Sequence, residues 1–360
     1  MSKIRLGFVG VGGMGQCAHL QNYATLPDCQ VVAISELRPQ LAAAVAARYG
    51  IPKVYADYRD MLAKESLDAL VHINQFQYHG QTIPQLAQAG KPILTEKPIA
   101  NSIETGEQIL AAVKAAGTPY YVAYHKRSDP ATIYAKDLMA QWLASGEFGR
   151  LRYVRLAMPP GDWIAAGFNA MIRTDETMPP SSADPCPASM QAHEFKYYFY
   201  LVNYYIHQIN LLRHIMGDYE VTHADPAGVL LVARCTDGPN TGVTATIEMS
   251  THSTSIAWQE SAFIAFERGT ISLELPAPLA HNRPGKVTVY RDAKDGKPET
   301  VIPELPWVHA MRQQAINFLK AVRGEPTPLA TPLDAVKDLR AMKQYMDLFA
   351  SAGGVVKSPW

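Results

Sequence analysis

The chain has 360 residues, with 33 basic and 33 acidic side chains and a formal net charge of zero. This length suggests two domains, each large enough to bury its own core. Because the basic residues form no stripe or run, nucleic acid and anionic membranes are not expected as partners.

The four cysteines, Cys17, Cys29, Cys186 and Cys235, show no CxxC spacing. Neither a metal site nor a disulfide framework is therefore predicted, and reduced thiols in a cytoplasmic protein are the simplest interpretation. The first apolar run begins at residue 4, which leaves no room for a signal peptide, and no run is long enough to span a bilayer.

The N-terminal stretch predicts a nucleotide-binding turn. An apolar run, Ile4–Val9, reads as a buried strand and leads directly into Gly10-x-Gly12-x-x-Gly15. In such a turn the first glycine reverses the chain, the second admits a pyrophosphate, and the third allows close packing of helix on strand. The anion would lie at the N-terminus of a helix that starts near Met14.

A second apolar run, Gln30–Ile34, predicts the next parallel strand and is followed by Glu36. An acid at this place accepts hydrogen bonds from the ribose diol of a dinucleotide and repels a 2′-phosphate. We therefore predict NAD as cofactor, with NADP disfavoured, although Arg38 could soften the discrimination.

Residues 1–125 alternate short apolar strands with helical stretches, which is typical of a doubly wound Rossmann domain. Ligands of such sheets bind beyond the carboxyl ends of the strands. The expected strands are Ile4–Val9, Val31–Ser35, Ala69–Ile73, Pro92–Thr95 and Tyr120–Ala123. The predicted cofactor contacts are Gly10, Gly12, Gly13, Met14, Gly15, Glu36, Arg38, Asn74, Gln75, His79, Glu96, Lys97 and Arg127.

Residues 126–360 predict an α+β domain for substrate binding and oligomerisation, with a large, mostly antiparallel sheet. One face of that sheet is expected to stay open and to pair copies into a homodimer or homotetramer. A Pro-rich stretch, Met178–Pro187, predicts a surface loop near the site or at a subunit contact. The expected strands are Leu151–Met158, Val229–Cys235, Val243–Met249, Ser261–Glu267, Thr270–Glu274 and Val287–Arg291.

The chain resembles the glucose–fructose oxidoreductase/inositol dehydrogenase (Gfo/Idh/MocA) family over nearly its whole length. The motifs that carry the resemblance are the Gly-rich turn, Gln88–Pro98 with its Glu96-Lys97-Pro98 end, Tyr124–Pro130 and Ile206–Arg213. The resemblance implies a Rossmann domain, a second α/β domain on an open sheet, and NAD(P)-dependent redox chemistry on sugars or cyclitols. It also assigns Lys97 to catalysis.

Oxidation of a secondary alcohol needs a positive group near the developing alkoxide and a base for the hydroxyl proton. Lys97 can supply the charge, and its bond to Pro98 is a candidate for the cis form. His207 is the candidate base because imidazole titrates near neutral pH. Asn203, His207, Asn210 and His214 are spaced as one polar stripe on a helix, whereas His214 itself is not expected to act.

Two positions depart from the family pattern. Asn203 stands where the family often has an aspartate, and an amide cannot stabilise an imidazolium as a carboxylate would. Asp162 or Glu194 could compensate. His125, where the family often has asparagine, could touch the nicotinamide side or the substrate.

Further substrate contacts are predicted at Asp162, Trp163, His193 and Tyr204, beside an aromatic run at 197–200. Aromatic faces pack on sugar rings, although core packing explains the run equally well. The favoured function is a dehydrogenase acting on a ring hydroxyl of a sugar, glycoside or cyclitol. The alternatives are redox-neutral glycoside cleavage through a transient 3-keto intermediate, with His193, Tyr204 or His125 as second base, and a non-catalytic dinucleotide-binding regulator.

Overall fold

The computed structural model describes residues 2–249 and 251–355, which fold into two compact units. The first unit contains the chain up to Tyr124 together with Ala166–Ser189 and Met311–Val336. The second contains His125–Ala165, Met190–Ala310 and the chain from Lys337 onward. The chain thus passes from the first unit to the second at residue 125, and two later segments return to the first unit.

The first unit is built on a six-stranded parallel sheet in the order β3-β2-β1-β4-β5-β6. This is the strand order of a dinucleotide-binding Rossmann sheet, and it confirms the predicted fold class. Its strands are β1 (Ile4–Val9), β2 (Cys29–Ser35), β3 (Lys53–Tyr55), β4 (Ala69–His72), β5 (Ile93–Glu96) and β6 (Tyr120–Ala123).

Helices cover this sheet, and local sequence explains several of their ends. Pro39 opens one helix and Gly50, at φ 63°, closes it, while Asp57 and Ser102 cap two others through their side chains. The predicted helix after the Gly-rich turn begins as a π-helical turn. The helical segments are η1 (Gly15–Leu20), α1 (Gln21–Tyr23), α2 (Pro39–Tyr49), α3 (Tyr58–Lys64), η2 (Phe76–Tyr78), α4 (His79–Ala87) and α5 (Ile103–Ala115).

Apolar packing explains why a late segment belongs to the first unit. Helix α9 (Ala310–Val322) carries Phe318, which is fully buried in the core beneath β1. Its ring makes edge contacts with Tyr23 at 6.5 Å and Tyr121 at 6.2 Å between centroids. Burying such a side chain contributes about 1.5–3 kcal/mol, which favours docking of α9 here.

The second unit contains an eight-stranded sheet in the order β14-β13-β12-β11-β7-β10-β9-β8. The β7–β10 pair is parallel and the other neighbours are antiparallel, as the mostly antiparallel prediction requires. The strands are β7 (Leu151–Ala157), β8 (Tyr219–Ala224), β9 (Leu230–Cys235), β10 (Thr244–Glu248), β11 (Glu260–Phe266), β12 (Gly269–Leu275), β13 (Lys286–Arg291) and β14 (Glu299–Val301).

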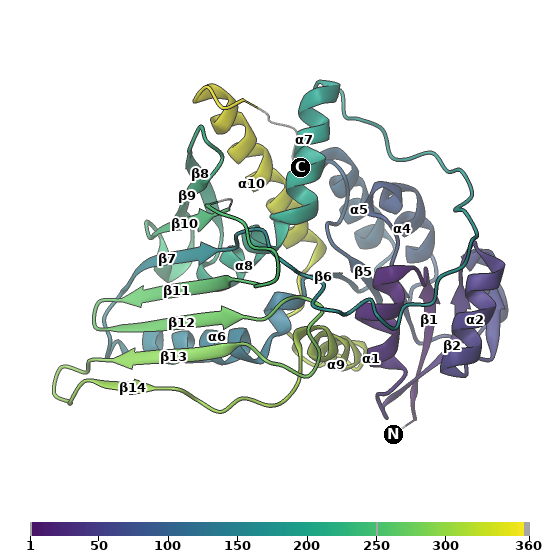
Figure 1. Cartoon of the computed structure of the whole chain (residues 1–360), viewed down its shortest axis with the longest axis horizontal. Helices are drawn as coiled ribbons and strands as arrows, with labels where there is room; N and C mark the ends of the chain where they lie inside the picture. The colour runs from purple at the N-terminus through teal and green to yellow at the C-terminus, as the bar shows by residue number, and fades with distance from the viewer. Residues whose placement is uncertain (1, 250, 356–360) are drawn as a thin grey trace. The chain divides into compact units, whose positions relative to one another are not determined.

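Helices α6 (Pro130–Ser145) and α8 (Ile206–Met216) pack on this sheet, α6 behind β12 and β13 in Figure 1 and α8 against β7 and β10. In β11 and β12 buried residues alternate with half-exposed ones, because one face meets the helices and the other stays open. The remaining segments are η3 (His125–Ser128), α7 (Ala192–Tyr204), η4 (Gly238–Asn240) and α10 (Pro332–Ser351).

The structure corrects several details of the sequence interpretation. Strands β3, β8 and β14 were not predicted from the sequence, and two of them contain only three residues. The single helix expected through Asn203 and His214 is two helices, α7 and α8, which meet at Tyr205. Because Tyr205 keeps a right-handed backbone (φ −84°, ψ −5°), the helical periodicity of the sequence does not reveal the break.

Candidate active site

The Gly-rich turn after β1 requires glycine at two positions. Gly10 has φ 90°, and a Cβ atom there would lie 2.2 Å from the carbonyl oxygen of Ile73. A Cβ atom on Gly15 would lie 2.6 Å from the carbonyl oxygen of Gly10, so the helical turn packs closely on the strand. The first and third glycines therefore have the geometry that the motif predicts.

The middle glycine of the motif, Gly12, is less crowded than the other two. A Cβ atom on Gly12 would make only an ordinary contact, 3.5 Å from a terminal nitrogen of Arg38. Glu36, buried at the end of β2, accepts the Val11 N–H at 3.1 Å and the Arg38 Nε–H at 2.8 Å. A carboxylate is thus fixed beside the turn at the place where a ribose diol binds, and these residues fit NAD.

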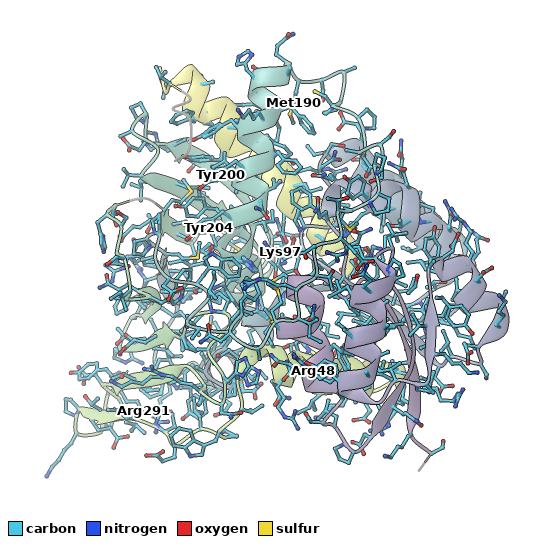
Figure 2. The ribbon with its side chains drawn as sticks, turned by 45° about the vertical axis from the view of Figure 1, so that its right-hand side comes forward. Arg48, Lys97, Met190, Tyr200, Tyr204 and Arg291 are labelled. Atoms are coloured by element: carbon cyan, nitrogen blue, oxygen red, sulfur yellow. The ribbon has the colours of Figure 1, made fainter. Side chains whose placement is uncertain are left out.

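Lys97 follows β5, and its bond to Pro98 is cis, as the sequence suggested (Figure 2). The Lys97 N–H donates to Glu96 Oε2 at 3.0 Å. The other carboxylate oxygen of Glu96 lies 2.6 Å from His19 Nε2. Burial alone would raise the pKa of Glu96, but the hydrogen bond and charge of His19, with the charge of Lys97, hold that pKa below its usual value.

His19 is a residue that sequence reasoning missed. It lies on η1, one turn beyond the glycine motif, and is buried with Glu96. The two residues are 77 positions apart, so no local pattern in the sequence links them. Through Glu96 this histidine orients the backbone at the start of Lys97.

Asn74, Gln75 and His79 follow β4 at the predicted edge of the sheet. Asn74 accepts the Gln75 N–H through its side chain, and Gln75 is exposed. His79 is fully buried, and its ring nitrogens lie 3.1 Å from the Ile99 carbonyl oxygen and 3.3 Å from that of Asn74. The imidazole thus supports the backbone of Asn74 rather than presenting a free edge to a ligand.

In the second unit the structure brings together two histidines that the sequence singled out separately. The His125 ring at the start of η3 meets the half-buried His207 ring at the start of α8 edge-on, with centroids 5.0 Å apart. The contact fixes the two rings relative to each other. The departure from the family pattern at His125 therefore lies directly against the predicted base.

The residues that come directly after these two histidines in the sequence, Lys126 and Gln208, share a buried carboxylate that was not predicted. Glu260, at the start of β11, pairs with Lys126 and accepts hydrogen bonds from Gln208 Nε2 at 2.8 Å and Trp258 Nε1 at 3.1 Å. Lys126 also lies 5.6 Å from the centre of the Trp258 ring. These contacts hold η3 against α8 next to the two histidines.

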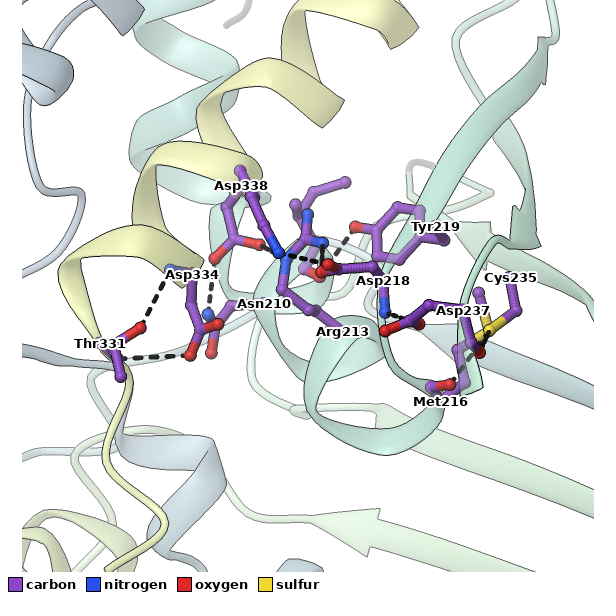
Figure 3. Close-up of polar contacts among 12 residues, drawn as sticks. Asn210, Arg213, Met216, Asp218, Tyr219, Cys235, Asp237, Thr331, Asp334 and Asp338 are labelled. Carbon is purple, nitrogen blue, oxygen red and sulfur yellow. Dashed lines mark hydrogen bonds and ion pairs between the residues drawn. The ribbon is translucent and has the colours of Figure 1, made fainter. Parts of the chain in front are cut away.

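Arg127, the next residue of η3, is also buried and also makes polar contacts within the second unit. Its Nε donates to Asn210 Oδ1 at 2.7 Å, and Asn210 in turn donates to Asp338 on α10. Arg213 joins Asp338 at 2.7 Å and Asp218 at 2.7 Å (Figure 3). The predicted polar stripe of α8 thus faces a buried ion network at Asn210. The cofactor role of Arg127 stays a prediction.

Several predicted carboxylates are engaged in local structure. Asp162 Oδ1 accepts the N–H groups of Ile164 and Ala165, both at 3.0 Å, and so closes a turn beside Trp163. Glu194 Oε2 accepts the Gln191 N–H at 2.8 Å as half of a capping box at the start of α7. Neither contact directs a carboxylate toward His207.

The predicted site residues on α7, the catalytic candidate Asn203 and the substrate contacts His193 and Tyr204, differ in accessibility. Asn203 and His193 are exposed, whereas Tyr204 is half-buried and lies one turn beyond Tyr200 on the helix (Figure 2). Burial raises the pKa of Tyr204 to about 12. Its phenol is therefore protonated at neutral pH and can donate a hydrogen bond, but it is a poor candidate for a base.

Burial and the charges of Arg127 and Lys136 lower the pKa of His214, and the expectation that it does not act stays a prediction. Among residues 2–249 and 251–355, no group of three or more His, Cys, Asp or Glu side chains could hold a metal ion. No helix in that described part of the chain is long and apolar enough to cross a membrane.

Comparison with known proteins agrees with this geometry. A family model described as "Oxidoreductase family, NAD-binding Rossmann fold" matches residues 4–124. Residues 4–124 thus match the model of the Gfo/Idh/MocA family. They form an NAD-binding Rossmann domain, which confirms the predicted family, fold class and cofactor.

The relatives of this Gfo/Idh/MocA domain are oxidoreductases. The chain is 27% identical over 230 residues to the uncharacterized oxidoreductase YrbE of Bacillus subtilis (strain 168), covering 64% of this chain and 58% of YrbE. It is 29% identical over 168 residues to scyllo-inositol 2-dehydrogenase (NAD(+)) of the same organism, covering 45% of this chain and 48% of the relative. The chain thus matches about half the length of these curated relatives.

The fold extends beyond the matched residues. The structure of levoglucosan dehydrogenase in complex with NADH and levoglucosan superimposes with a TM-score of 0.72 and covers 98% of both chains. At 18% sequence identity this likeness shows the fold of both units and not their activity.

Proposed function

We propose that this protein is an NAD-dependent oxidoreductase that acts on a ring hydroxyl of a sugar, glycoside or cyclitol. The observation that carries the proposal is the ring contact of His125 with His207 in the second unit. Sequence reasoning selected the two histidines on different grounds, 82 positions apart, and a pair of imidazoles is suited to accepting a proton near neutral pH.

In the proposed reaction His207 accepts the hydroxyl proton of the substrate, and the ring contact with His125 orients its imidazole. Lys97 in the first unit supplies positive charge for the oxygen that becomes an alkoxide. Bound NAD supplies the hydride acceptor. Asp162, Trp163, His193 and Tyr204 remain proposed substrate contacts, with Tyr204 as a hydrogen-bond donor.

The substrate class is tested with a panel of inositol isomers, levoglucosan and simple glycosides, each incubated with enzyme and NAD. We expect NADH to accumulate with at least one ring alcohol, measured as absorbance at 340 nm. Tight NADH binding without turnover of any panel member or cleavage of any glycoside would favour the dinucleotide-binding regulator instead.

A second candidate, redox-neutral glycoside cleavage, is favoured by one feature of the first unit. Residues Ala166–Ser189 cover the Gly-rich turn, with Phe168 and Met171 against Gly13. A covered turn retains a cofactor, and such a cycle requires that the cofactor stay bound. Nitrophenyl glycosides distinguish the two functions, because cleavage releases nitrophenol with catalytic NAD and little net absorbance change at 340 nm.

We also propose that the open face of the second sheet pairs copies of the chain into a dimer or tetramer. Half-exposed residues alternate along β11 and β12 on that face, among them Phe263. Light scattering coupled to gel filtration tests this proposal. A monomer at micromolar concentration would contradict it.

A further inference from the structure

The segment Ala166–Ser189 is fastened along the Rossmann unit by hydrogen bonds to several of its elements. Gln16 exchanges two bonds with the backbone of Ile172, at 2.9 and 3.2 Å. Farther along, Asp184 is buried and accepts the Gly80 N–H at 2.8 Å. We refer to Ala166–Ser189 as the crossing segment.

Between these anchors the crossing segment places Glu176 at the start of α2. Its Oε1 accepts the Gln40 N–H and its Oε2 accepts the Leu41 N–H, both at 2.9 Å. Thr174 Oγ1 donates to Oε2 at 3.0 Å. The N-cap residue, Arg38, makes no side-chain cap, so this 11-residue helix takes its cap from a carboxylate 136 positions away.

The start of α2 is also the place where dinucleotide-binding folds distinguish NAD from NADP. An acid at the end of β2 favours the free ribose hydroxyl, and a nearby arginine accommodates a 2′-phosphate. Both residue types are present, as Glu36 and Arg38. Arg38 is held by Glu36 at 2.8 Å, and its side chain is only 21% exposed.

Glu176 adds a second negative charge beside that arginine. An open cavity is lined by Arg38 and Gln40 on one side and by Asp175 and Glu176 on the other. Burial would raise the pKa of Glu176, but the N–H groups of Gln40 and Leu41, the Thr174 hydroxyl and the charge of Arg38 hold that pKa below its usual value. The carboxylate is therefore ionised at neutral pH.

We propose that Glu176 is a specificity-determining residue that excludes NADP. Its carboxylate occupies the two N–H groups at the start of α2 and offsets the charge of Arg38, the groups that would otherwise bind a 2′-phosphate. Because a phosphate monoester carries close to two negative charges at neutral pH, it is repelled by both Glu36 and Glu176. This inference rests on the proposed NAD-dependent function and deepens it.

The test compares wild type with Glu176→Gln, which keeps an oxygen for one N–H and removes the charge. Dissociation constants for NADH and NADPH are measured by fluorescence, and those for 5′-AMP and adenosine 2′,5′-bisphosphate by calorimetry. We expect NADPH and the bisphosphate to bind roughly tenfold more tightly to the variant, with NADH and 5′-AMP changed less than threefold. The gain should shrink at high salt.

The matched control is Asp60→Asn, which removes one exposed negative charge from α3, at a residue that does not line this cavity. We expect less than a threefold change for any of the four ligands. Glu176→Ala is the second variant, and it should show the same gain for NADPH even if thermal unfolding shows that α2 is less stable. An equal gain in Asp60→Asn, or an unchanged NADPH affinity in both Glu176 variants, would overturn the inference. If wild-type protein bound neither dinucleotide, the proposed function itself would fail.

Discussion

The Gly-rich turn of the first unit and the polar cluster between η3 and α8 of the second unit differ in which groups they use. We refer to Lys126, Arg127, Gln208 and Asn210, with their partners Glu260 and Asp338, as the η3–α8 cluster. At the turn, the polar groups are those of the backbone, because Gly10 adopts a positive φ and Gly15 lets the helical turn pack closely on the strand. In the cluster, side chains of η3, α8, β11 and α10 pair inside the unit. The first arrangement depends on local backbone geometry, and the second depends on burial of complementary charges.

The largest expected effect comes from breaking the ion network of the second unit. Asp338 is fully buried and holds both Arg213 and Asn210, so Asp338→Ala removes one of the two carboxylates that pair with the buried Arg213 cation, together with the acceptor of the Asn210 amide. The free energy of unfolding should fall by about 3–5 kcal/mol in urea titrations. As control, Asp347→Ala removes an exposed partner of Lys343 on the same helix and should lower it by about 0.5 kcal/mol or less. Equal losses in the two variants would mean that the network is no stronger than a surface pair.

The next largest effect is expected on turnover, and it tests the side chain of Lys97 in the first unit. Lys97→Ala removes the charge expected to stabilise the alkoxide, a loss of roughly 3–4 kcal/mol for one preorganised donor. Turnover should fall about a hundredfold or more, whereas the NADH dissociation constant should change less than threefold. Lys91→Ala, an exposed lysine before β5, should turn over like wild type. Normal turnover in Lys97→Ala would place the chemistry at other residues.

A smaller effect is expected on the pH dependence of the free energy of unfolding, and it concerns Asp129, the buried N-cap residue of α6 in the second unit. Asp129 Oδ1 accepts the N–H groups of Ala131 and Gly285, and burial raises the pKa of Asp129 from 3.8 to about 6. Because the folded-state pKa is the higher one, this group stabilises the protein below about pH 4 and the contribution disappears as the pH rises through about 6. Asp129→Asn stays neutral, so its stability relative to wild type should improve by up to roughly 3 kcal/mol between pH 4 and 7.

Urea titrations at four pH values measure this difference. Asp137→Asn, at an exposed position of the same helix, should follow wild type at every pH. If the Asp129→Asn curve also runs parallel to wild type, the buried carboxyl does not titrate in this range.

The smallest expected effect is a shift in the pH dependence of activity, and it tests whether residue 203 interacts with His207 of the histidine pair. Asn203→Asp places a carboxylate where the family often has one, and it should raise the pKa of a neighbouring imidazolium by up to about one unit. The pH at which activity rises should move upward accordingly, whereas Asn203→Ser should leave it in place. An unshifted profile in Asn203→Asp would show that residue 203 does not interact with His207.

Sequence alone determined the features that depend on neighbouring residues. The Gly-rich turn, the acid after β2 and the Glu96-Lys97-Pro98 end of β5 were all predicted, because strand periodicity and glycine spacing are local properties. The choice of His207 also came from the sequence, although the helix around it is broken at Tyr205.

Tertiary structure decided the partners of these residues. His19 meets Glu96 across 77 positions, Glu176 caps α2 across 136, and His125 lies against His207 only because η3 packs on α8. Strands as short as β3 and β14 likewise form through pairing with a neighbour rather than through their own propensity. Contacts between distant segments depend on how the whole chain buries its apolar surface, and no local pattern encodes that outcome.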